Sequence, residues 1–253
     1  MNNLPTMIII AGGLGTRLKI LTKEKPKSMV DINKKPFIFH QLNLLKKNNI
    51  ENVIICTGHI SESIKSYVGN GKKFGLNVTY SDDGKNLIGT GGALKKSSSL
   101  VEGPFFSMYG DSYLDINFEK IYSFYKNNNK VPLMTIFKNN DNWDKSNISY
   151  VDNKIVSYKK KLSGIDMNYI DYGLSIMSSK DINSIEREKF DMSLLYNHLL
   201  NNNNLIGYKV FERFYEVGSL LGINDLELYL KSKTGELNEW LCWSLYERSY
   251  WNN

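Results

Sequence analysis

Short apolar runs alternate with helix-like patterns through the first half of the chain. Runs bounded by turn residues are typical of buried strands, and they occur at Met7–Ala11, Val53–Thr57, Val78–Tyr80, Phe105–Tyr109 and Leu133–Phe137. The segments between these runs have helical spacing, at Pro36–Lys47, Ser61–Val68 (with Ser61 as a candidate N-cap), Gly91–Leu100 and Phe118–Lys126. This alternation predicts a mainly parallel sheet with helices on both faces.

The second half of the chain has a different pattern. Two short apolar runs flank the residues "DNK" and predict a hairpin, at Ile148–Val151 and Ile155–Tyr158. Further strands are predicted at Ile170–Met177 and Leu205–Val210, and helices at Met192–Leu200 and Ile223–Leu230. We therefore expect a small antiparallel extension at one end of a mixed sheet. The aromatic segment 236–253 predicts a helical tail that packs on this body or on a partner subunit.

The composition is that of an ordinary globular protein. Hydrophobic residues make up 42% of the 253 positions and charged residues 23%, within the usual range. No apolar run reaches the length of a membrane span, and the first residues lack the basic region of a signal peptide. Cys56 and Cys242 have no metal-ligand spacing. We expect a cytoplasmic protein with reduced thiols and no membrane partner, and the sequence leaves a homo-oligomer open.

The stretch "IIIAGGLGTRLKILTKEKPKSM" carries the first candidate chemistry. Glycines after a strand let backbone N–H groups approach an anion closely. Arg17 can then bind phosphate oxygens with its guanidinium group, and Lys27 can add a point charge. A glycine-rich turn alone also fits a simple tight turn. The spacing excludes a Walker A loop and the Gly-x-Gly-x-x-Gly motif of dinucleotide-binding folds.

Five segments in chain order resemble the sugar-phosphate nucleotidyltransferase family: "AGGLGTRL", "PKSM", "IGTGGAL", "YGDS" and "FYEVGS". The resemblance implies a nucleotide-binding three-layer α/β sandwich with a mainly parallel, Rossmann-like sheet, to which the sequence pattern adds the C-terminal helix. It also implies one nucleotidyltransferase domain over residues 1–235. Members of the family join a phosphorylated acceptor to the α-phosphate of a nucleoside triphosphate and release pyrophosphate.

The resemblance also assigns roles to residues. Arg17 would hold the β- and γ-phosphates, and Lys27 would lie between the α-phosphate and the acceptor phosphate. Asp111 would be a Mg²⁺ ligand, although an aspartate there also fits a turn cap. Glu216 stands where the family has a second metal-binding aspartate. The implied nucleotide-binding residues are Ala11, Gly12, Gly13, Gly15, Thr16, Gly89, Thr90 and Gly91.

The acceptor side departs from the family pattern in two places. Sugar-using members have Glu-Lys-Pro where this chain has the run Tyr158–Lys161, and an asparagine where it has Asp171. The lysines also fit a solvated hairpin end. Alternatively, Lys159 and Lys160 bind a carboxylate and Asp171 binds an ammonium group of a zwitterionic acceptor. The composition and these departures also resemble the phosphoglutamine cytidylyltransferases of capsular phosphoramidate synthesis. That resemblance implies CTP as the donor, phosphoglutamine as the acceptor and a role in capsule or surface polysaccharide synthesis. The sequence is also similar to heptose-1-phosphate guanylyltransferases, which makes a guanylyl- or uridylyltransferase acting on a sugar 1-phosphate the alternative.

Two other classes compete with an enzyme. A non-catalytic nucleotide-sensing module could have this fold, but the chain retains the charged residues that catalysis needs. A nucleic-acid-binding protein is suggested only by the net charge of +6, and the aromatic tail is interleaved with glutamates rather than with a basic patch. We therefore expect no nucleic-acid partner. The expected substrates are a nucleoside triphosphate and a small phosphorylated acceptor, with Mg²⁺.

Overall fold

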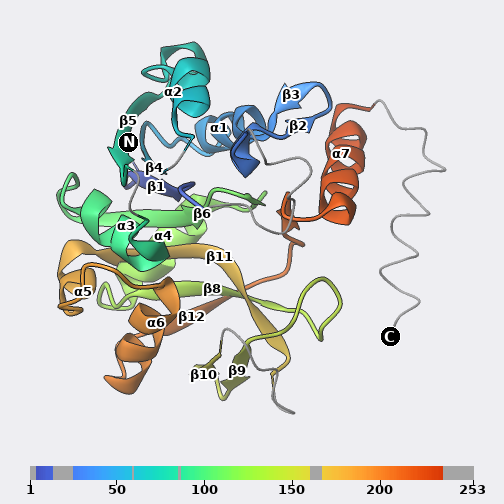
Figure 1. The fold of residues 1–253 in the computed structure, drawn as a ribbon. Coiled ribbons are helices and arrows are strands. Elements are labelled where there is room, and N and C mark those ends of the chain that lie inside the picture. Colours follow the sequence, from blue (N-terminus) through green and yellow to red (C-terminus); the bar gives the residue numbers. More distant parts are fainter. Residues whose placement is uncertain (1–3, 14–24, 59, 85–86, 160–166, 236–253) are drawn as a thin grey trace.

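The computed structural model describes residues 4–13, 25–58, 60–84, 87–159 and 167–235 (Figure 1). Its centre is a parallel four-strand unit in the order β6–β1–β4–β5. The strands are β1 (Met7–Ile10), β4 (Asn52–Thr57), β5 (Asn77–Asp82) and β6 (Pro104–Tyr109). Their carboxyl ends lie at one edge of the sheet, where ligands bind in open α/β folds.

The second half of the sheet is mixed. The long strand β11 (Tyr169–Ser178) runs antiparallel to β6 and to β8 (Leu133–Lys138), and β12 (Ile206–Val210) runs parallel to β8. A hairpin of β9 (Ile148–Val151) and β10 (Lys154–Tyr158) joins β11 at the outer end. The predicted mixed sheet with a small antiparallel extension is confirmed.

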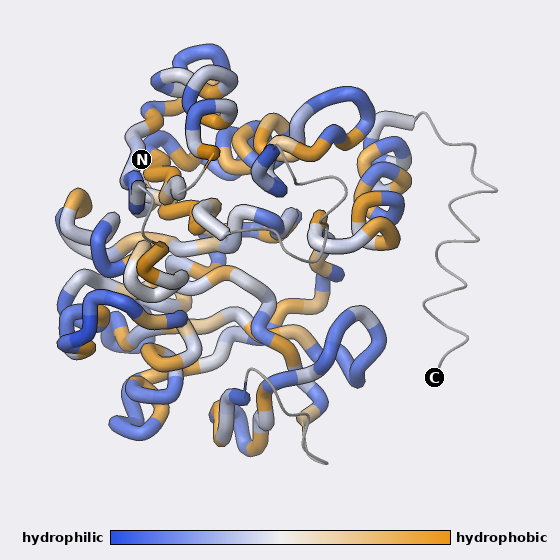
Figure 2. The backbone as a smooth tube through the Cα atoms, viewed as in Figure 1, coloured by the Kyte–Doolittle hydropathy of each residue, from blue (hydrophilic) through white to orange (hydrophobic). Residues whose placement is uncertain are grey.

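Helices cover both faces of the sheet and make three layers (Figure 1). The alternation of side chains along β1 decides which layer each residue joins, because Met7 and Ile9 enter one buried cluster and Ile8 and Ile10 the other. The first cluster includes residues of α1 (Phe37–Lys47), α2 (Glu62–Val68) and α4 (Phe118–Asn127). The second includes residues of α3 (Gly89–Ser98), α5 (Ser179–Asn183) and α6 (Met192–Asn201). Figure 2 shows the hydrophobic colour concentrated on the strands between these layers.

A third, smaller cluster brings the end of the described chain back to its beginning. Helix α7 (Leu220–Thr234) buries Leu226 against Ile32 and Phe37, beside the hairpin of β2 (Asp31–Ile32) and β3 (Lys35–Pro36). The short strand β13 (Tyr215–Glu216) pairs with β7 (Ser112–Tyr113). The sequence patterns did not predict these two short pairings, although β7 and β13 position the candidate site.

The remaining elements differ from expectation only locally. Helix α3 begins at Gly89 rather than Gly91, and α7 is longer than its predicted core. Ser61 precedes α2, but its hydroxyl donates to Asp82 at 3.3 Å and makes no cap hydrogen bond. No helix within the described residues is long and apolar enough to cross a membrane. The predicted tail at 236–253 lies outside the described residues, so both it and the domain boundary at residue 235 stay predictions.

Candidate active site

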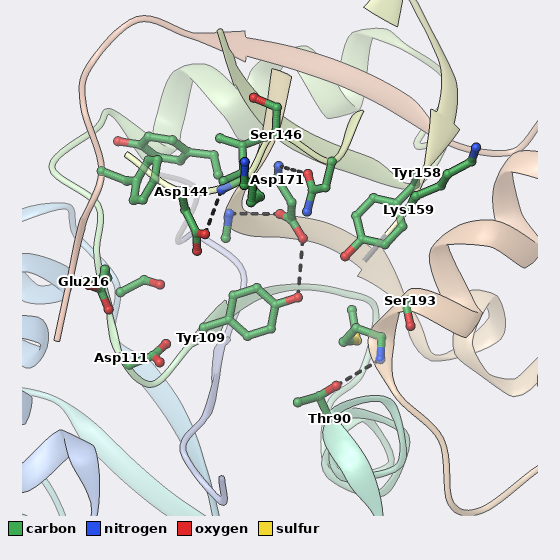
Figure 3. Close-up of a pocket in the computed structure, with 18 residues that line it drawn as sticks. Thr90, Tyr109, Asp111, Asp144, Ser146, Tyr158, Lys159, Asp171, Ser193 and Glu216 are labelled. Atoms are coloured by element: carbon green, nitrogen blue, oxygen red, sulfur yellow. Dashed lines mark hydrogen bonds between the residues drawn. The ribbon is translucent and has the colours of Figure 1, made fainter. Parts of the chain in front are cut away.

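A cavity of about 580 Å³ opens where β6, β7 and β11 meet the loop 139–147 and the start of α6. Asp111 and Glu216 lie at one end of it, and Thr90 and Ser193 lie at the other (Figure 3). Asp171 projects from the wall between them (Figure 3). Polar groups from distant parts of the chain thus converge on one hollow, which is the usual form of a small-molecule site.

Lys27 and Asp111 form an ion pair at one end of the site. Lys27 opens the 3-10 turn η2 (Lys27–Met29), directly after Pro26. Its Nζ donates to Asp111 Oδ2 at 2.7 Å, and the two side chains are 17% and 31% exposed. Asp111 follows Gly110, whose N–H donates to Ile10 O at 2.9 Å across the ends of β6 and β1. The pair therefore lies beside the start of the glycine-rich loop.

Strand pairing brings Glu216 to the same place. Glu216 lies opposite Ser112 in the β7–β13 ladder, and Val217 N donates to Asp111 O at 2.9 Å. The Glu216 carboxylate accepts hydrogen bonds from Gly218 N and from the Ser219 hydroxyl, the second at 2.6 Å. A methyl group on Gly218 would collide with Glu216 and lie 3.2 Å from Lys27 Nζ. Only glycine therefore lets the Lys27 cation and the Glu216 carboxylate approach this position together.

The two carboxylates fit a Mg²⁺ ion that is also bound by phosphates. Magnesium commonly takes one or two protein carboxylates, with water and substrate phosphate oxygens completing the octahedron. The described residues contain no cluster of three or more His, Cys, Asp or Glu side chains that would hold a metal by itself. Asp111 Oδ2 receives the Lys27 hydrogen bond, and both Glu216 oxygens accept bonds from their own loop. Each carboxylate keeps lone pairs beyond these bonds.

Asp171 is held with its carboxylate toward the cavity. The register of β11 against β8 shifts between Asp171 and Ser175, and Gly173 adopts a φ of +96° that other residues rarely adopt. Gly173 N donates to Asp171 Oδ1 at 2.9 Å, and Asp171 N donates to Asn147 Oδ1 at 2.9 Å. Burial raises the pKa of Asp171 to about 6, although hydrogen bonds from Gly173, Tyr109 and Tyr158 oppose the rise.

Tyrosine hydroxyls surround this carboxylate. Tyr109 donates to Asp171 Oδ2 at 3.4 Å, and the rings of Tyr158 and Tyr196 contact edge to face at 5.3 Å. Burial raises the pKa of Tyr109, Tyr158 and Tyr196 above the ordinary phenol value. The three phenols therefore stay neutral at physiological pH and act as hydrogen-bond donors. No ion pair between described residues involves Asp171. Among these residues its carboxylate is stabilised by the neutral donors Gly173 N, Tyr109 and Tyr158, whereas the Tyr196 hydroxyl donates to Ser175 Oγ at 3.2 Å.

The amino-acid sequence matches the model of a family described as nucleotidyl transferase over residues 6–147. The match covers more than half of the chain and includes both Lys27 and Asp111. The chain belongs to the nucleotidyl transferase family. The family predicted from the motifs is confirmed, and so is the prediction that the protein is an enzyme of the nucleotidyltransferase class.

Two curated relatives carry the name D-glycero-alpha-D-manno-heptose 1-phosphate guanylyltransferase. The protein of Campylobacter jejuni subsp. jejuni is 33% identical over 157 residues, which are 61% of this chain and 68% of the relative. The protein of Aneurinibacillus thermoaerophilus is 36% identical over 116 residues, which are 46% of this chain and 50% of the relative. A mannose-1-phosphate guanylyltransferase subunit of Xenopus tropicalis is 32% identical over 135 residues, 52% of this chain and 37% of the relative.

Solved structures confirm the nucleotidyltransferase fold. A putative glucose-1-phosphate thymidylyltransferase of Bacillus anthracis superposes with a TM-score of 0.79 at 20% identity, covering 88% of this chain and 94% of that structure. The inositol-1-phosphate CTP transferase of T. maritima superposes with a TM-score of 0.75 at 18% identity, covering 91% of this chain and 97% of that structure.

The glycine-rich loop of this nucleotidyl transferase is described only at its start. Ala11 N donates to Cys56 O at 3.1 Å, and Gly12 packs against the backbone of Gly58. A methyl group on Gly13 would meet nothing within 4 Å, so this backbone borders open space. The predicted phosphate-binding residues Gly15, Thr16 and Arg17 and the predicted acceptor-binding residue Lys160 lie outside the described residues.

The glycines of "IGTGGAL" have a partner within the protein. Gly91 N and Gly92 N donate to Phe190 O at 2.9 and 3.1 Å, and a side chain on Gly91 would overlap the Phe190 ring. Gly89 has a φ of +80° and is also packed against the Phe190 backbone. The nucleotide-binding roles predicted for Gly89 and Gly91 stay predictions, but these contacts alone explain why glycines stand there. Thr90 lines the cavity, and its Oγ1 accepts a hydrogen bond from Met192 N at 2.9 Å.

Lys159 lies at the cavity rim. Its backbone N–H donates to Asn147 O at 2.9 Å, whereas its side chain is exposed and extends away from Asp171 (Figure 3). The structure thus assembles Lys27, Asp111 and Glu216 at one end of the site and keeps Lys159 separate from Asp171.

Sequence reasoning missed Tyr109 and Asn147. Tyr109 begins the quoted motif "YGDS", which was a usable signal. Asn147 had no signal in the sequence, because its bond to the Asp171 backbone depends on the pairing of β9 with β11.

Proposed function

We propose that this nucleotidyl transferase moves a nucleoside monophosphate from a nucleoside triphosphate to the phosphate of a small acceptor, with release of pyrophosphate. The observation that carries the proposal is the Lys27–Asp111 pair at 2.7 Å, with Glu216 on the neighbouring strand, at the end of the cavity. The reaction brings two anions together. A cation beside metal-binding carboxylates is the arrangement that this chemistry requires.

Lys27 contributes in the transition state. As the acceptor oxygen approaches the α-phosphate, negative charge accumulates between the two phosphates, and a preorganised ammonium group stabilises it. No side chain has to become a nucleophile, since the acceptor phosphate attacks directly. The backbone amides of Gly12 and Gly13, with Gly15, Thr16 and Arg17, are proposed to hold the triphosphate so that attack occurs in line.

Asp111 and Glu216 are proposed to hold Mg²⁺. The ion would supply positive charge to the phosphate oxygens when it is bound. The protein's own contribution is to keep the two carboxylates adjacent through the β7–β13 ladder. In the free enzyme the Lys27 ammonium group partly neutralises the Asp111 carboxylate. This limits the repulsion between the two carboxylates.

The surroundings of Asp171 support the proposal that the acceptor carries an amine. Its carboxylate is half-buried in the cavity wall, and among the described residues it accepts hydrogen bonds only from neutral donors and forms no ion pair. A ligand ammonium group would supply the missing positive charge. Lys159 at the rim is suited to a more distant carboxylate of the same ligand. A phosphorylated amino-acid amide such as phosphoglutamine fits this order of charges, with Lys160 as a second proposed contact.

The alternative acceptor is a sugar 1-phosphate. The relatives named above are guanylyltransferases of heptose and mannose 1-phosphate, and an aspartate also accepts hydrogen bonds from sugar hydroxyls. However, the family model matches residues 6–147 and so does not include Asp171 or Glu216. The match therefore does not decide which acceptor Asp171 binds. For the amine acceptor we propose CTP as the donor and a role in capsule or surface polysaccharide synthesis. For the sugar acceptor we propose GTP or UTP.

A pyrophosphate-release screen tests both the transferase reaction and the choice of acceptor. Each of the four common nucleoside triphosphates is combined with phosphoglutamine, phosphoethanolamine, heptose 1-phosphate, mannose 1-phosphate and glucose 1-phosphate, with Mg²⁺ and with EDTA. Metal-dependent release with any pair supports the transferase, and no release with any pair contradicts it. Release with amine-bearing acceptors alone supports the proposal of a zwitterionic acceptor. Efficient release with sugar phosphates alone would establish the alternative.

A further inference from the structure

The guanidinium group of Arg213 lies between two aromatic rings from distant parts of the chain. Its central carbon is 3.4 Å from the ring centroid of Trp143, in the loop 139–147, and 4.8 Å from that of Tyr215, in β13. One edge of the group forms an ion pair with Asp225 of α7. Arg213 Nε is buried and has no hydrogen-bond partner among the described residues. Among the described residues the side chain is therefore held mainly by its flat faces, together with the ion pair to Asp225.

On its Trp143 side, the stack contacts the loop beside Asp171, where the acceptor is proposed to bind. Asp144, Lys145, Ser146 and Asn147 of the same loop line the cavity. The buried side chain of Asn139 braces the loop internally, because its Nδ2 donates to Asp144 O at 2.6 Å and to Ser146 Oγ at 3.1 Å. A braced loop moves as a unit. The position of Trp143 therefore influences the position of Asn147, which bonds to the Asp171 backbone.

On its Tyr215 side, the stack contacts β13, which carries Glu216 and so lies at the end of the cavity that is proposed to bind Mg²⁺. Tyr215 precedes Glu216 and stacks on Tyr229 of α7 at 4.3 Å between ring centroids. Tyr229 in turn contacts Tyr113 of β7 edge to face at 6.3 Å. One column of aromatic rings and a guanidinium thus runs from the acceptor loop to both strands of the β7–β13 ladder, which positions Asp111 and Glu216.

We propose that Arg213 is a positioning residue that clamps the loop 139–147 onto β13 and so holds the acceptor-binding wall in register with the phosphate-transfer end of the site. The proposal rests on the proposed function, because it names the residue that aligns that same site. An arginine suits the task better than a lysine. Its planar group stacks on aromatic faces while one edge binds a carboxylate, whereas an ammonium group is a hydrated point charge.

Arg213→Lys and Trp143→Ala test the clamp against simple loss of stability. Arg213→Lys keeps a positive charge for Asp225 but removes the flat face. We expect the acceptor KM to rise about tenfold, the order of a desolvated cation–π contact. The triphosphate KM should stay within about twofold of wild type, because the glycine-rich loop does not contact this stack through any described residue. Trp143→Ala should reproduce the effect, and the double variant should be no worse than either single one. Trp143→Phe should restore most of the affinity.

Lys126→Ala is the matched control. It removes a cation–π contact of 4.7 Å with Tyr122 on α4, on the other face of the sheet from the cavity-lining α6, and should change neither KM. Equal losses of acceptor and triphosphate affinity together with a large fall in Tm would overturn the clamp in favour of general destabilisation. So would an unchanged acceptor KM in Arg213→Lys.

Limited trypsin digestion separates this proposal from the proposed function. A released loop exposes the bond after Lys145, so Arg213→Lys and Trp143→Ala should be cut there several times faster than wild type, while Lys126→Ala should not. If the wild-type protein turns over no substrate pair, the transferase proposal fails and the cleavage rates still decide the clamp. Equal cleavage rates in wild type and Arg213→Lys would refute the clamp even in an active enzyme.

Discussion

Lys27 and Asp111, 84 positions apart in the chain, are joined by a hydrogen bond of 2.7 Å at one end of the cavity. Lys27 comes from a short 3-10 turn and Asp111 from the end of a parallel strand, so only the folded chain brings them together. Each group is partly buried and neutralises the other. Removing either one leaves a partly buried charge without its partner. The two substitutions below should nevertheless have different kinetic signatures, because the two groups have different proposed roles.

Asp111→Asn should nearly abolish turnover, by about a thousandfold, because it removes the negative charge proposed to bind Mg²⁺ where the two substrates meet. The rate of pyrophosphate release at saturating substrates and a series of Mg²⁺ concentrations measures the effect. The control is Asp152→Asn, at the exposed turn of the β9–β10 hairpin. It should leave the rate of pyrophosphate release unchanged. An Asp111→Asn enzyme that retained most of its rate would show that Asp111 does not bind the metal.

Lys27→Ala should lower kcat far more than it raises the KM for triphosphate. The lysine is proposed to act on charge that develops only in the transition state, and such interactions appear in kcat. Steady-state kinetics with varied triphosphate separates the two constants. Lys180→Ala, exposed on α5, removes the same charge far from Asp111 in the sequence and serves as the control. Weaker triphosphate binding with unchanged kcat would contradict this role.

Glu216→Gln should raise the Mg²⁺ concentration that is needed for half-maximal rate. The amide oxygen can keep one of the two hydrogen bonds from Gly218 and Ser219 but loses the charge. Ser219→Ala separates the roles, since Ser219 Oγ caps α7 by accepting from Gly222 N at 2.9 Å. We expect Ser219→Ala to cost about 1 kcal/mol of stability and to leave the Mg²⁺ dependence unchanged. A Glu216→Gln enzyme with wild-type Mg²⁺ dependence would limit Glu216 to the structural role.

Asp171→Asn should raise the KM of an amine-bearing acceptor by about one to two powers of ten, because a charge-assisted hydrogen bond contributes roughly 1.5–3 kcal/mol. The triphosphate KM should be nearly unchanged. Wild-type affinity for the amine should fall as pH drops through about 6, where Asp171 gains a proton. The ratio of wild-type to variant KM, taken at each pH, cancels the titration of the acceptor phosphate itself. If a sugar phosphate is the true acceptor, the variant should be tolerated and the ratio should stay flat.

Asp171 should also make the fold less stable at higher pH. Burial raises the pKa of this carboxyl from 3.8 to about 6, so the folded chain binds the proton more tightly than the unfolded chain does. The free energy of unfolding then falls as pH rises from about 4 to about 6, and it levels off at higher pH, where the carboxyl is ionised in both states. Asp171→Asn should be more stable than wild type at pH 8, by a few kcal/mol at most, and the gain should vanish near pH 4. Urea unfolding across this range measures it, and a gain independent of pH would exclude the carboxyl as its source.

Local patterns in the sequence determined the elements and the layers. The apolar runs at β1, β4 and β6 and the helical spacing of α1 and α4 are properties of neighbouring residues, and burial on both faces of the sheet follows from them. The glycine-rich motif and "YGDS" likewise predicted the end of the site that is proposed to bind phosphate, because each is a short segment whose chemistry is contained in its own residues.

Contacts between distant residues were decided only by the tertiary structure. Two-residue strands such as β7 and β13 have no periodicity to detect, yet their pairing brings Glu216 to Asp111. The bulge that turns Asp171 into the cavity depends on the register of β11 against β8, and the glycines of α3 make room for Phe190, about a hundred positions away. The stack of Trp143, Arg213 and Tyr215 is invisible in the sequence for the same physical reason. Side-chain packing between distant segments depends on the whole folded backbone, whereas a strand or helix pattern depends on a few adjacent residues.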